Sequence, residues 1–395
     1  MSDEWVETTL GEVVSVSRER VDPRVLEPTE LIHYSIPVLD ATNEPASEAS
    51  SLIQSHKFKV SKDSILVSLL NPRIPRVWLA RGAENAVCST EFAVVSPRDL
   101  QNLLVEFLHL LCQTDEFWIE LQKRAVGSTG SRQRAKVDGL LGIPTSLPPL
   151  PVQRRIVDLI AHLDNHLANL QTEREAAESA ATTLREYLFN GAAEGDLMPL
   201  AEVADWYSGS TPKAGSPEYY EGGTIPWAVI ADVLNGPITE TATLITEAGL
   251  EKIGRLAPIG AVLVTMYGTI GRVGLARVEM ATNQAIAWGT AKPNVLPEYL
   301  FHALRHLGPH LDSLGRGATQ RNINREILRS QLIRLPGLER QREIVAIMNS
   351  MNESVNVLAT ETLSLERLRG SMLSALLAGS LIVPNDYDSM LSEVA

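Results

Sequence analysis

The feature that most constrains this chain is a long internal repeat. Residues 147–191 recur as residues 335–379 at a constant offset of 188 and without a gap, and 13 of the 45 aligned positions are identical. A repeat of this length indicates duplication, so any fold proposed for one half of the chain must also serve the other half.

Each copy predicts one long helix with a narrow apolar stripe. Apolar residues recur every three or four positions, which is the 3.5-residue period of helices that pair as a coiled coil. Each copy follows a proline (Pro151 or Pro336) and ends at a glycine (Gly191 or Gly379). At 1.5 Å per residue, roughly 35 residues span about 50 Å. The residues expected to pair the helices are Ile156, Ile160, Leu163, Leu167, Leu170, Ile344, Met348, Met351, Val355 and Leu358.

The segments ahead of the two helices also repeat each other. In both, short strand-like runs separated by Pro, Asn and Gly precede a helical segment. We therefore predict an α+β protein with two mixed α/β domains, each followed by a long helix. The two helices are expected to form an intrachain antiparallel coiled coil with pseudo-two-fold symmetry. The predicted boundaries are 1–146 for the first domain, 147–191 for the central helix, 192–334 for the second domain, 335–380 for the C-terminal helix and 381–395 for a flexible, acidic tail.

Basic residues gather in two places along an acidic chain. The 48 acidic residues exceed the 35 basic ones and give a net charge of −13. A nucleic-acid-binding protein of this composition must concentrate its basic residues locally. Residues 123–136 include five basic residues and no acidic one, and residues 305–334 include six arginines and two acidic residues. Loops beside helices often collect such residues, but two clusters at equivalent positions of a repeat favour a shared anion-binding role.

Composition also limits where the chain works. No apolar run approaches the 18 residues of a membrane span, and the first residues are acidic, unlike a signal peptide. The two cysteines, Cys88 and Cys112, offer no disulfide framework. We expect a cytoplasmic protein that does not contact membranes.

Motifs typical of catalysis are missing. There is no P-loop, and the glycines of 268–274 have the wrong spacing for a dinucleotide site, so they are expected to form a tight turn between two strands. His302, His306 and His310 are four apart, but Gly308-Pro309 is expected to break the helix before the third. We interpret them as exposed or amphipathic histidines and expect no metal site.

The polar loop ahead of each long helix is the best candidate for binding DNA. Residues 127–136 and 317–325 combine small residues, amides and bases. Small residues bring backbone N–H groups to phosphate, and Arg, Asn and Gln can hydrogen-bond base edges in the major groove. Helix capping is the alternative interpretation of the same loops.

Taken together, these segments resemble the specificity subunit of type I restriction-modification systems over nearly the whole chain. The resemblance rests on the Leu-Pro-x-Leu-x-x-Gln-Arg-x-Ile-Val entries that begin at 147 and 335, on residues 317–323, and on 207–227, which look like the start of a target recognition domain. Residues 70–78 look like a family loop. With the polar loops, the DNA-binding candidates are Asn71, Arg73, Arg76, Arg132, Arg134, Lys136, Lys213, Tyr267, Arg272, Arg316, Gln320, Arg321, Asn322 and Arg325.

The resemblance implies a DNA-reading adaptor without catalysis of its own. In the family, each target recognition domain reads one half of a split target in double-stranded DNA, and the paired helices set the unread gap. Two modification (methyltransferase) subunits dock on the helices, and restriction (translocase) subunits can join them. No cofactor is then expected on this chain, while S-adenosylmethionine, ATP and Mg are expected on the partner subunits. The alternative is a cytosolic coiled-coil scaffold with two ligand-binding heads and no DNA role.

Overall fold

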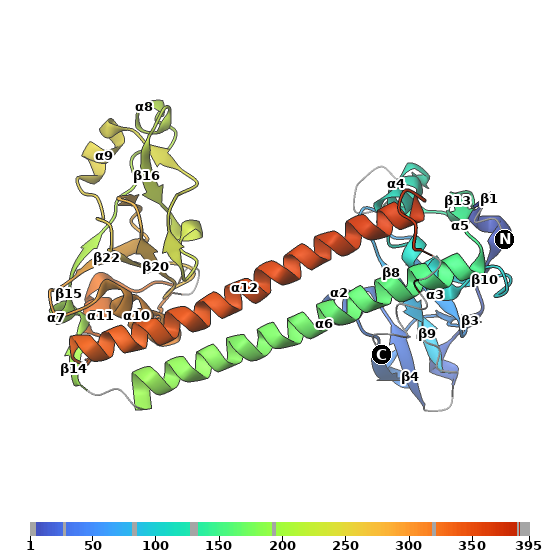
Figure 1. Cartoon of the computed structure of the whole chain (residues 1–395), viewed down its shortest axis with the longest axis horizontal. Coiled ribbons are helices and arrows are strands. Elements are labelled where there is room, and N and C mark those ends of the chain that lie inside the picture. The colour runs from blue at the N-terminus through green and yellow to red at the C-terminus, as the bar shows by residue number, and fades with distance from the viewer. Residues whose placement is uncertain are drawn as a thin grey trace. The chain divides into compact units, whose positions relative to one another are not determined.

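The computed structural model describes residues 5–26, 29–80, 85–126, 133–191, 195–317, 321–384 and 387. The chain folds as two compact units: unit 1 comprises Met1–Leu170 with Glu361–Ala395, and unit 2 comprises Gln171–Thr360. Two long helices, α6 (Leu150–Glu186) and α12 (Leu338–Leu377), each run from one unit into the other (Figure 1). The units therefore differ from the predicted division, in which each whole helix followed its own domain. Each half of a helix is assigned to the unit whose core it covers.

Unit 1 combines β-sheets with short helices. Its strands are β1 (Val6–Thr9), β2 (Val14–Ser17), β3 (Arg20–Val21), β4 (Glu30–Tyr34), β5 (Ala46–Ala49), β6 (Lys57–Lys59), β7 (Ser64–Ser68), β8 (Val77–Ala80), β9 (Ala86–Cys88), β10 (Phe92–Pro97), β11 (Ala125–Val126), β12 (Arg134–Ala135) and β13 (Pro144–Leu147). Its helices ahead of α6 are α1 (Leu10–Val13), α2 (Ile36–Thr42), α3 (Val105–Leu111), α4 (Asp115–Lys123) and α5 (Val137–Leu141). A four-stranded sheet has the order β2-β10-β7-β8, and a five-stranded sheet has the order β3-β6-β9-β4-β5.

Unit 2 repeats this plan with different outer parts. Its strands are β14 (Asp196–Pro199), β15 (Ala204–Ser208), β16 (Ile225–Ala228), β17 (Pro237–Ile238), β18 (Leu244–Ile245), β19 (Val262–Thr265), β20 (Val273–Ala276), β21 (Ala281–Thr282), β22 (Ile286–Ala291) and β23 (Leu332–Leu335). Its short helices are α7 (Leu200–Val203), α8 (Pro217–Tyr220), α9 (Glu247–Ile253), α10 (Pro297–Ser313) and α11 (Arg325–Ser330). A five-stranded sheet has the order β15-β22-β19-β20-β17, and a three-stranded sheet has the order β18-β16-β21.

The two units share a common inner architecture. The order β2-β10-β7-β8 in unit 1 corresponds to β15-β22-β19-β20 in unit 2. In both units the first strand pairs antiparallel with the strand that leads into a long helix, β1 with β13 and β14 with β23. The second sheets differ, since unit 2 has only three strands there and adds α8 and α9 beside them (Figure 1). These elements confirm the predicted α+β fold with two mixed domains, each followed by a long helix.

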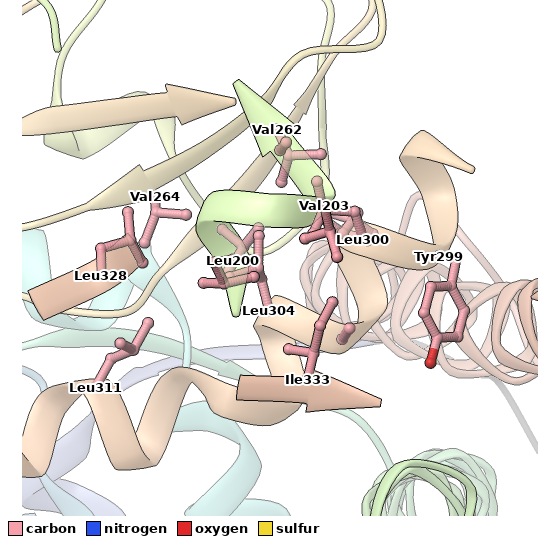
Figure 2. Close-up of a cluster of buried hydrophobic side chains, with 14 of the residues drawn as sticks. Leu200, Val203, Val262, Val264, Tyr299, Leu300, Leu304, Leu311, Leu328 and Ile333 are labelled. Carbon is pink, nitrogen blue, oxygen red and sulfur yellow. The ribbon is translucent and has the colours of Figure 1, made fainter. Parts of the chain in front are cut away.

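Each unit contains a large apolar core beside smaller apolar clusters. In unit 2, Figure 2 shows side chains from five elements meeting: α7, β19, α10, α11 and β23. Central strands such as β19 are buried along their whole length, as expected for a run of apolar residues in the middle of a sheet. Tyr299 of α10 is fully buried, and its hydroxyl donates to the Arg334 carbonyl oxygen at 2.7 Å. This bond ties α10 to the strand that precedes α12.

Within each unit the two long helices run antiparallel. In unit 1, Ile156 and Ile160 near the start of α6 share a core with Leu373 and Leu376 near the end of α12. In unit 2 the relation is reversed, because Leu188 just beyond the end of α6 shares a core with Ile344 and Met348 near the start of α12. The remaining predicted pairing residues are buried or half-buried: Leu163, Leu167, Leu170, Met351, Val355 and Leu358.

A buried glutamine fastens each domain to its long helix. The Gln341 side chain is 0% exposed; its Oε1 accepts from the Leu296 N–H at 2.8 Å, and its Nε2 donates to the carbonyl oxygens of Asn294 (3.0 Å) and Pro336 (2.8 Å). Gln153, its counterpart in the repeat, is also 0% exposed and makes the matching three bonds in unit 1, with Leu104, Asn102 and Pro148. Both glutamines bind backbone groups outside the regular helices and sheets, and the bonds to Pro148 and Pro336 are buried.

The start of the predicted flexible tail packs on unit 1. Val383 is 6% exposed and belongs to the core that includes Ile156, and Tyr387 packs against the same core. Both side chains therefore contribute apolar surface to the core within the segment that was predicted as a flexible tail. None of the described helices combines the length and apolarity needed to cross a bilayer.

Candidate nucleic-acid interface

Two loops of unit 2 are joined through their backbones. The loop after β19 contains Tyr267 and Gly268, and the loop before α11 contains Arg321 and Asn322. Tyr267 forms an antiparallel bridge with Asn322, and the Gly268 N–H donates to the Arg321 carbonyl oxygen at 3.1 Å. We call these segments the paired loops of unit 2.

A further backbone bridge extends this arrangement to the end of α10. Arg316 and Asn322 exchange hydrogen bonds in both directions, at 3.1 and 3.0 Å. Arg325 begins α11, directly after Asn324, whose side chain caps that helix by accepting from the Ile327 N–H at 2.8 Å. The structure thus gathers Tyr267, Arg316, Arg321 and Asn322 and places Arg325 three residues further on.

Unit 1 contains the same pairing of loops. Leu70 bridges Arg134, and the Asn71 N–H donates to the Gln133 carbonyl oxygen at 2.8 Å. Asn71 has φ 49° and Gly268, at the equivalent point of unit 2, has φ 66°, so both turns need the left-handed backbone that Asn and Gly tolerate best. The tight turn predicted at 268 therefore has a counterpart in unit 1.

Several of the basic residues that were predicted to bind DNA are already paired with carboxylates. Arg76 donates to both oxygens of Asp40 at 2.6 Å, and its side chain is only 10% exposed. The hydrogen bonds from Arg76 lower the pKa of Asp40. Arg134 lies 2.6 Å from Glu91, and Arg321 pairs with Asp312 at 3.3 Å. These carboxylates partly neutralise the positive charge that the arginines could offer to phosphate.

Other basic residues that were predicted to bind DNA are exposed to solvent. Arg73 in the turn after Asn71, Lys136 ahead of α5, and Arg316 and Arg325 of unit 2 are exposed, and none of the four forms an ion pair within the described ranges. Lys213 is also exposed but lies in a different loop, after β15. The predicted residues Arg132 and Gln320 lie outside the described residues.

Arg272 is not part of the backbone bridges, but it shares a pocket with two basic residues that the sequence did not single out. It lines a pocket of about 270 Å³ together with Arg185 of α6 and Arg305 of α10. The repeat could have pointed to both, because each arginine aligns with an uncharged residue of the other half. Arg185 aligns with Leu373, and Arg305 aligns with Gln113 when Glu298 is placed on Glu106.

The three histidines of α10 differ in burial, which corrects their interpretation as exposed or amphipathic. His302 is 1% exposed, and its Nε2 lies 2.9 Å from the Asn349 Oδ1. His306 is half-buried and stacks on Phe189, whereas His310 is exposed and lies 3.1 Å from the Gln331 Oε1. No group of side chains suited to holding a metal ion occurs in the described part of the chain.

The predicted break at Gly308-Pro309 is also wrong. Helix α10 continues through Pro309 to Ser313. Gly308 allows the helix to approach the turn after β19 closely, since a Cβ there would lie 2.7 Å from the Gly271 carbonyl oxygen. Leu311, which is 0% exposed, then anchors the last turn in the core. The buried contacts on both sides of the proline outweigh its usual cost to a helix.

The burial of His302 predicts a pH-dependent stability. Burial lowers its pKa from the ordinary value of 6.5 to about 4, so the unfolded chain takes up a proton at a higher pH than the folded protein. The stabilisation is complete above pH 6.5 and is lost as the pH falls toward 4. Between pH 7.5 and 5.5 this residue alone should lower the free energy of unfolding by about 1.4 kcal/mol. Urea denaturation at the two pH values should show a smaller difference in His302→Leu, which carries the residue found at the equivalent Leu110; an equal difference would contradict the assignment.

Comparisons with known proteins agree with this architecture. The family model described as type I restriction modification DNA specificity domain matches residues 2–179 and 195–367. The EcoR124I/EcoR124II specificity subunit of Escherichia coli is 25% identical over 215 residues, which are 52% of this chain and 53% of that protein. The putative MjaX specificity subunit of Methanocaldococcus jannaschii is 22% identical over 288 residues, or 67% of this chain and 64% of that protein. The chain thus spans about half to two thirds of the length of these two relatives.

Solved structures show the same fold. The HsdS subunit from Thermoanaerobacter tengcongensis is 23% identical with a TM-score of 0.51, covering 95% of this chain and 97% of that one. A chain from a study of assembly and conformational transition in a type I R-M system is 24% identical with a TM-score of 0.67, covering 95% of this chain and 98% of that one. Because the family model covers both halves, this chain belongs to the family of type I restriction-modification DNA specificity proteins.

Proposed function

We propose that this chain is the DNA-reading specificity subunit of a type I restriction-modification complex, with one half of a bipartite target read by each unit. The observation that supports the proposal best is the pair of bridged loops that recurs in both units, with exposed basic residues beside each pair. A loop whose backbone is bonded to a neighbouring loop presents its side chains at fixed positions, as the reading of base edges requires.

The differences between the units support the reading of two different half-sites. The inner strands and the glutamine anchors repeat, whereas the residues at the bridge do not: Leu70 and Arg134 in unit 1 stand where unit 2 has Tyr267 and Asn322. Asn and Arg favour different base edges, adenine and guanine respectively. The family match also favours a DNA reader over the alternative of a scaffold without DNA.

The long helices are proposed to serve as spacer and docking surface. Large apolar side chains of α12 outside the predicted seam are exposed: Ile347 (38%), Val357 (57%), Leu363 (48%) and Leu368 (47%). We infer that two modification subunits cover such residues and carry the S-adenosylmethionine. Restriction subunits with ATP and Mg would join through the same complex, so that catalysis resides on partners and this chain binds no cofactor.

Electrophoretic mobility shifts test the proposal. The chain alone is expected to bind DNA weakly, and the chain with its methyltransferase partner should bind a bipartite site tightly. Because phosphate contacts release counterions, this affinity should fall steeply as salt rises. The absence of any complex when the partner is present, or a complex insensitive to salt, would reject the DNA-reading function.

Arg325 provides a test of the paired loops of unit 2. Arg325→Ala is expected to weaken binding of the partnered complex about 5- to 150-fold, which corresponds to the usual 1–3 kcal/mol for one DNA contact of an arginine. The matched control is Arg277→Ala, which removes an exposed arginine that pairs with Glu298 at 3.1 Å. If both variants bind as the wild type does, Arg325 serves only the start of α11. Arg321→Ala probes the same loop but also releases Asp312.

A further inference from the structure

Unit 2 contains a pocket lined by three arginines. Arg185 reaches it from α6, Arg305 from α10 and Arg272 from the turn between β19 and β20. The pocket has a volume of about 270 Å³, and Asp312 is the single acid among its described lining residues. That carboxylate already lies 3.3 Å from the Arg321 Nη1. Little negative charge is therefore left within the pocket lining to neutralise the three guanidinium groups.

Two of these arginines are partly withdrawn from water. The Nε of Arg185 is buried and has no hydrogen-bond partner within the described structure. Arg305 donates from Nη1 to the Asn352 Oδ1 at 3.2 Å, which is a neutral acceptor, and its guanidinium lies 5.6 Å from the Phe301 ring centre. Burial and the nearby charge of Arg185 lower the pKa of Arg305 to about 10. Neighbouring cations with so little compensation destabilise a folded protein unless an anion joins them.

The duplication provides an internal comparison for this charge. At the positions of Arg185 and Arg305, unit 1 has Leu373 and Gln113. Unit 1 instead has Arg369 on α12, which lies 3.0 Å from an Asp164 oxygen and 2.9 Å from the Gln113 Oε1. Asp164 aligns with the neutral Asn352 of unit 2. The helix pairing thus folds with a neutralised arginine in unit 1, so the uncompensated cations of unit 2 are not a requirement of the scaffold.

The pocket is linked to the paired loops of unit 2 through Asp312. Arg272 directly follows the turn whose Gly268 is bonded to Arg321, and Asp312 joins the pocket to Arg321. A ligand in the pocket therefore lies beside the segment proposed to read DNA. Guanidinium groups bind phosphate oxygens through paired N–H donors, which makes phosphate the best match for three converging arginines.

We propose that Arg185, Arg272 and Arg305 form a binding site for one phosphate of the DNA backbone beside the second half-site. The inference rests on the proposed function and adds a contact to the backbone instead of a base. Such a contact fixes the position of the duplex without selecting its sequence. It also gives unit 2 a DNA contact that the duplicated positions of unit 1 do not provide.

The first test uses the full chain without partner or DNA, and inorganic phosphate as the probe. Arg305→Gln and Arg185→Leu introduce the residues that unit 1 has at these positions, and Arg277→Gln removes an exposed arginine outside the pocket as a control. Both pocket variants should raise the melting temperature by a few degrees, because each removes a poorly compensated charge. Phosphate should raise the melting temperature of the wild type and Arg277→Gln more than that of the pocket variants, compared with chloride at equal ionic strength. Equal effects of phosphate on all four proteins would overturn the site.

The second test uses the complex with its methyltransferase partner on bipartite DNA. The double variant Arg185→Leu/Arg305→Gln should bind about tenfold more weakly, and the slope of log affinity against log salt should decrease by about one, as expected for losing one phosphate contact. The preference among second half-site sequences should not change. A changed preference with an unaltered slope would reject a phosphate site. If the wild-type complex binds no DNA at all, the proposed function fails, whereas the phosphate effect on melting still decides whether the pocket binds anions.

Discussion

Replacing Gln341 with leucine is expected to lower the free energy of unfolding of unit 2 by about 3–5 kcal/mol, although the two side chains are similar in size. The amide of Gln341 is 0% exposed and makes three hydrogen bonds to backbone groups, at 2.8, 3.0 and 2.8 Å. Leucine can replace none of them. The Leu296 N–H and the Pro336 carbonyl oxygen would lose their partner in a largely buried place, each at a cost of about 1–3 kcal/mol, and the Asn294 carbonyl oxygen would lose a further hydrogen bond.

The same substitution can be made at Gln153, the counterpart of Gln341 in the repeat. Gln153→Leu should destabilise unit 1 by a similar amount, because Gln153 makes the equivalent bonds. Gln122→Leu on α4 is the control, since Gln122 is exposed. Urea denaturation measures the loss, and hydrogen exchange locates it: Gln341→Leu should increase exchange around the start of α10, and Gln153→Leu around the start of α3. If Gln341→Leu unfolds at the same urea concentration as Gln122→Leu, the anchor does not stabilise the domain.

Removing one heptad from each long helix should shorten the unread gap of the DNA target while both half-site sequences stay the same. Seven residues of helix span about 10.5 Å, which corresponds to about three base pairs at 3.4 Å each. Deleting residues 171–177 and 355–361 keeps the period of the seam, because seven residues are two turns of a coiled coil. The deletions are made where α6 and α12 pass between units, so each domain keeps its core contacts.

Sequencing of methylated adenines, in cells that contain the methyltransferase partner, reads the gap directly. Deleting five residues from each helix is the control, because it rotates the seam by more than a third of a turn and should abolish methylation. A new half-site sequence in the seven-residue variant would show that the helices read bases. An unchanged gap would show that they do not set the distance.

Much of the fold follows from the periodic parts of the sequence. The heptad stripe predicted α6 and α12, because a 3.5-residue period has one structural explanation at this length. The repeat predicted that the two domains share an order of strands, and the matching sheets confirm it. The division of each helix between two units could not be predicted in this way. It depends on which distant residues, such as Leu373 for Ile160, cover the same core.

Single polar residues were harder to interpret, because their role depends on partners that are far away in the sequence. Gln153 and Gln341 are identical in the repeat, yet most of their hydrogen-bond partners lie 45–51 residues away in the sequence. His302 was predicted to be exposed or amphipathic, but it is 1% exposed and its Nε2 meets the Asn349 side chain of α12. Arg185 and Arg305 interrupt no motif, and only the structure places them in one pocket.

The division of the chain between the units has a consequence for synthesis on the ribosome. Unit 2 is one continuous segment, Gln171–Thr360, and can complete its core as soon as those residues have emerged. Unit 1 cannot, because Leu373, Leu376 and Val383 are made only after the whole of unit 2 and belong to the same core as Ile156 and Ile160. The domain translated first is therefore the one finished last. A nascent chain that stops after Thr360 leaves an apolar surface on unit 1 open to chaperones and to other nascent copies.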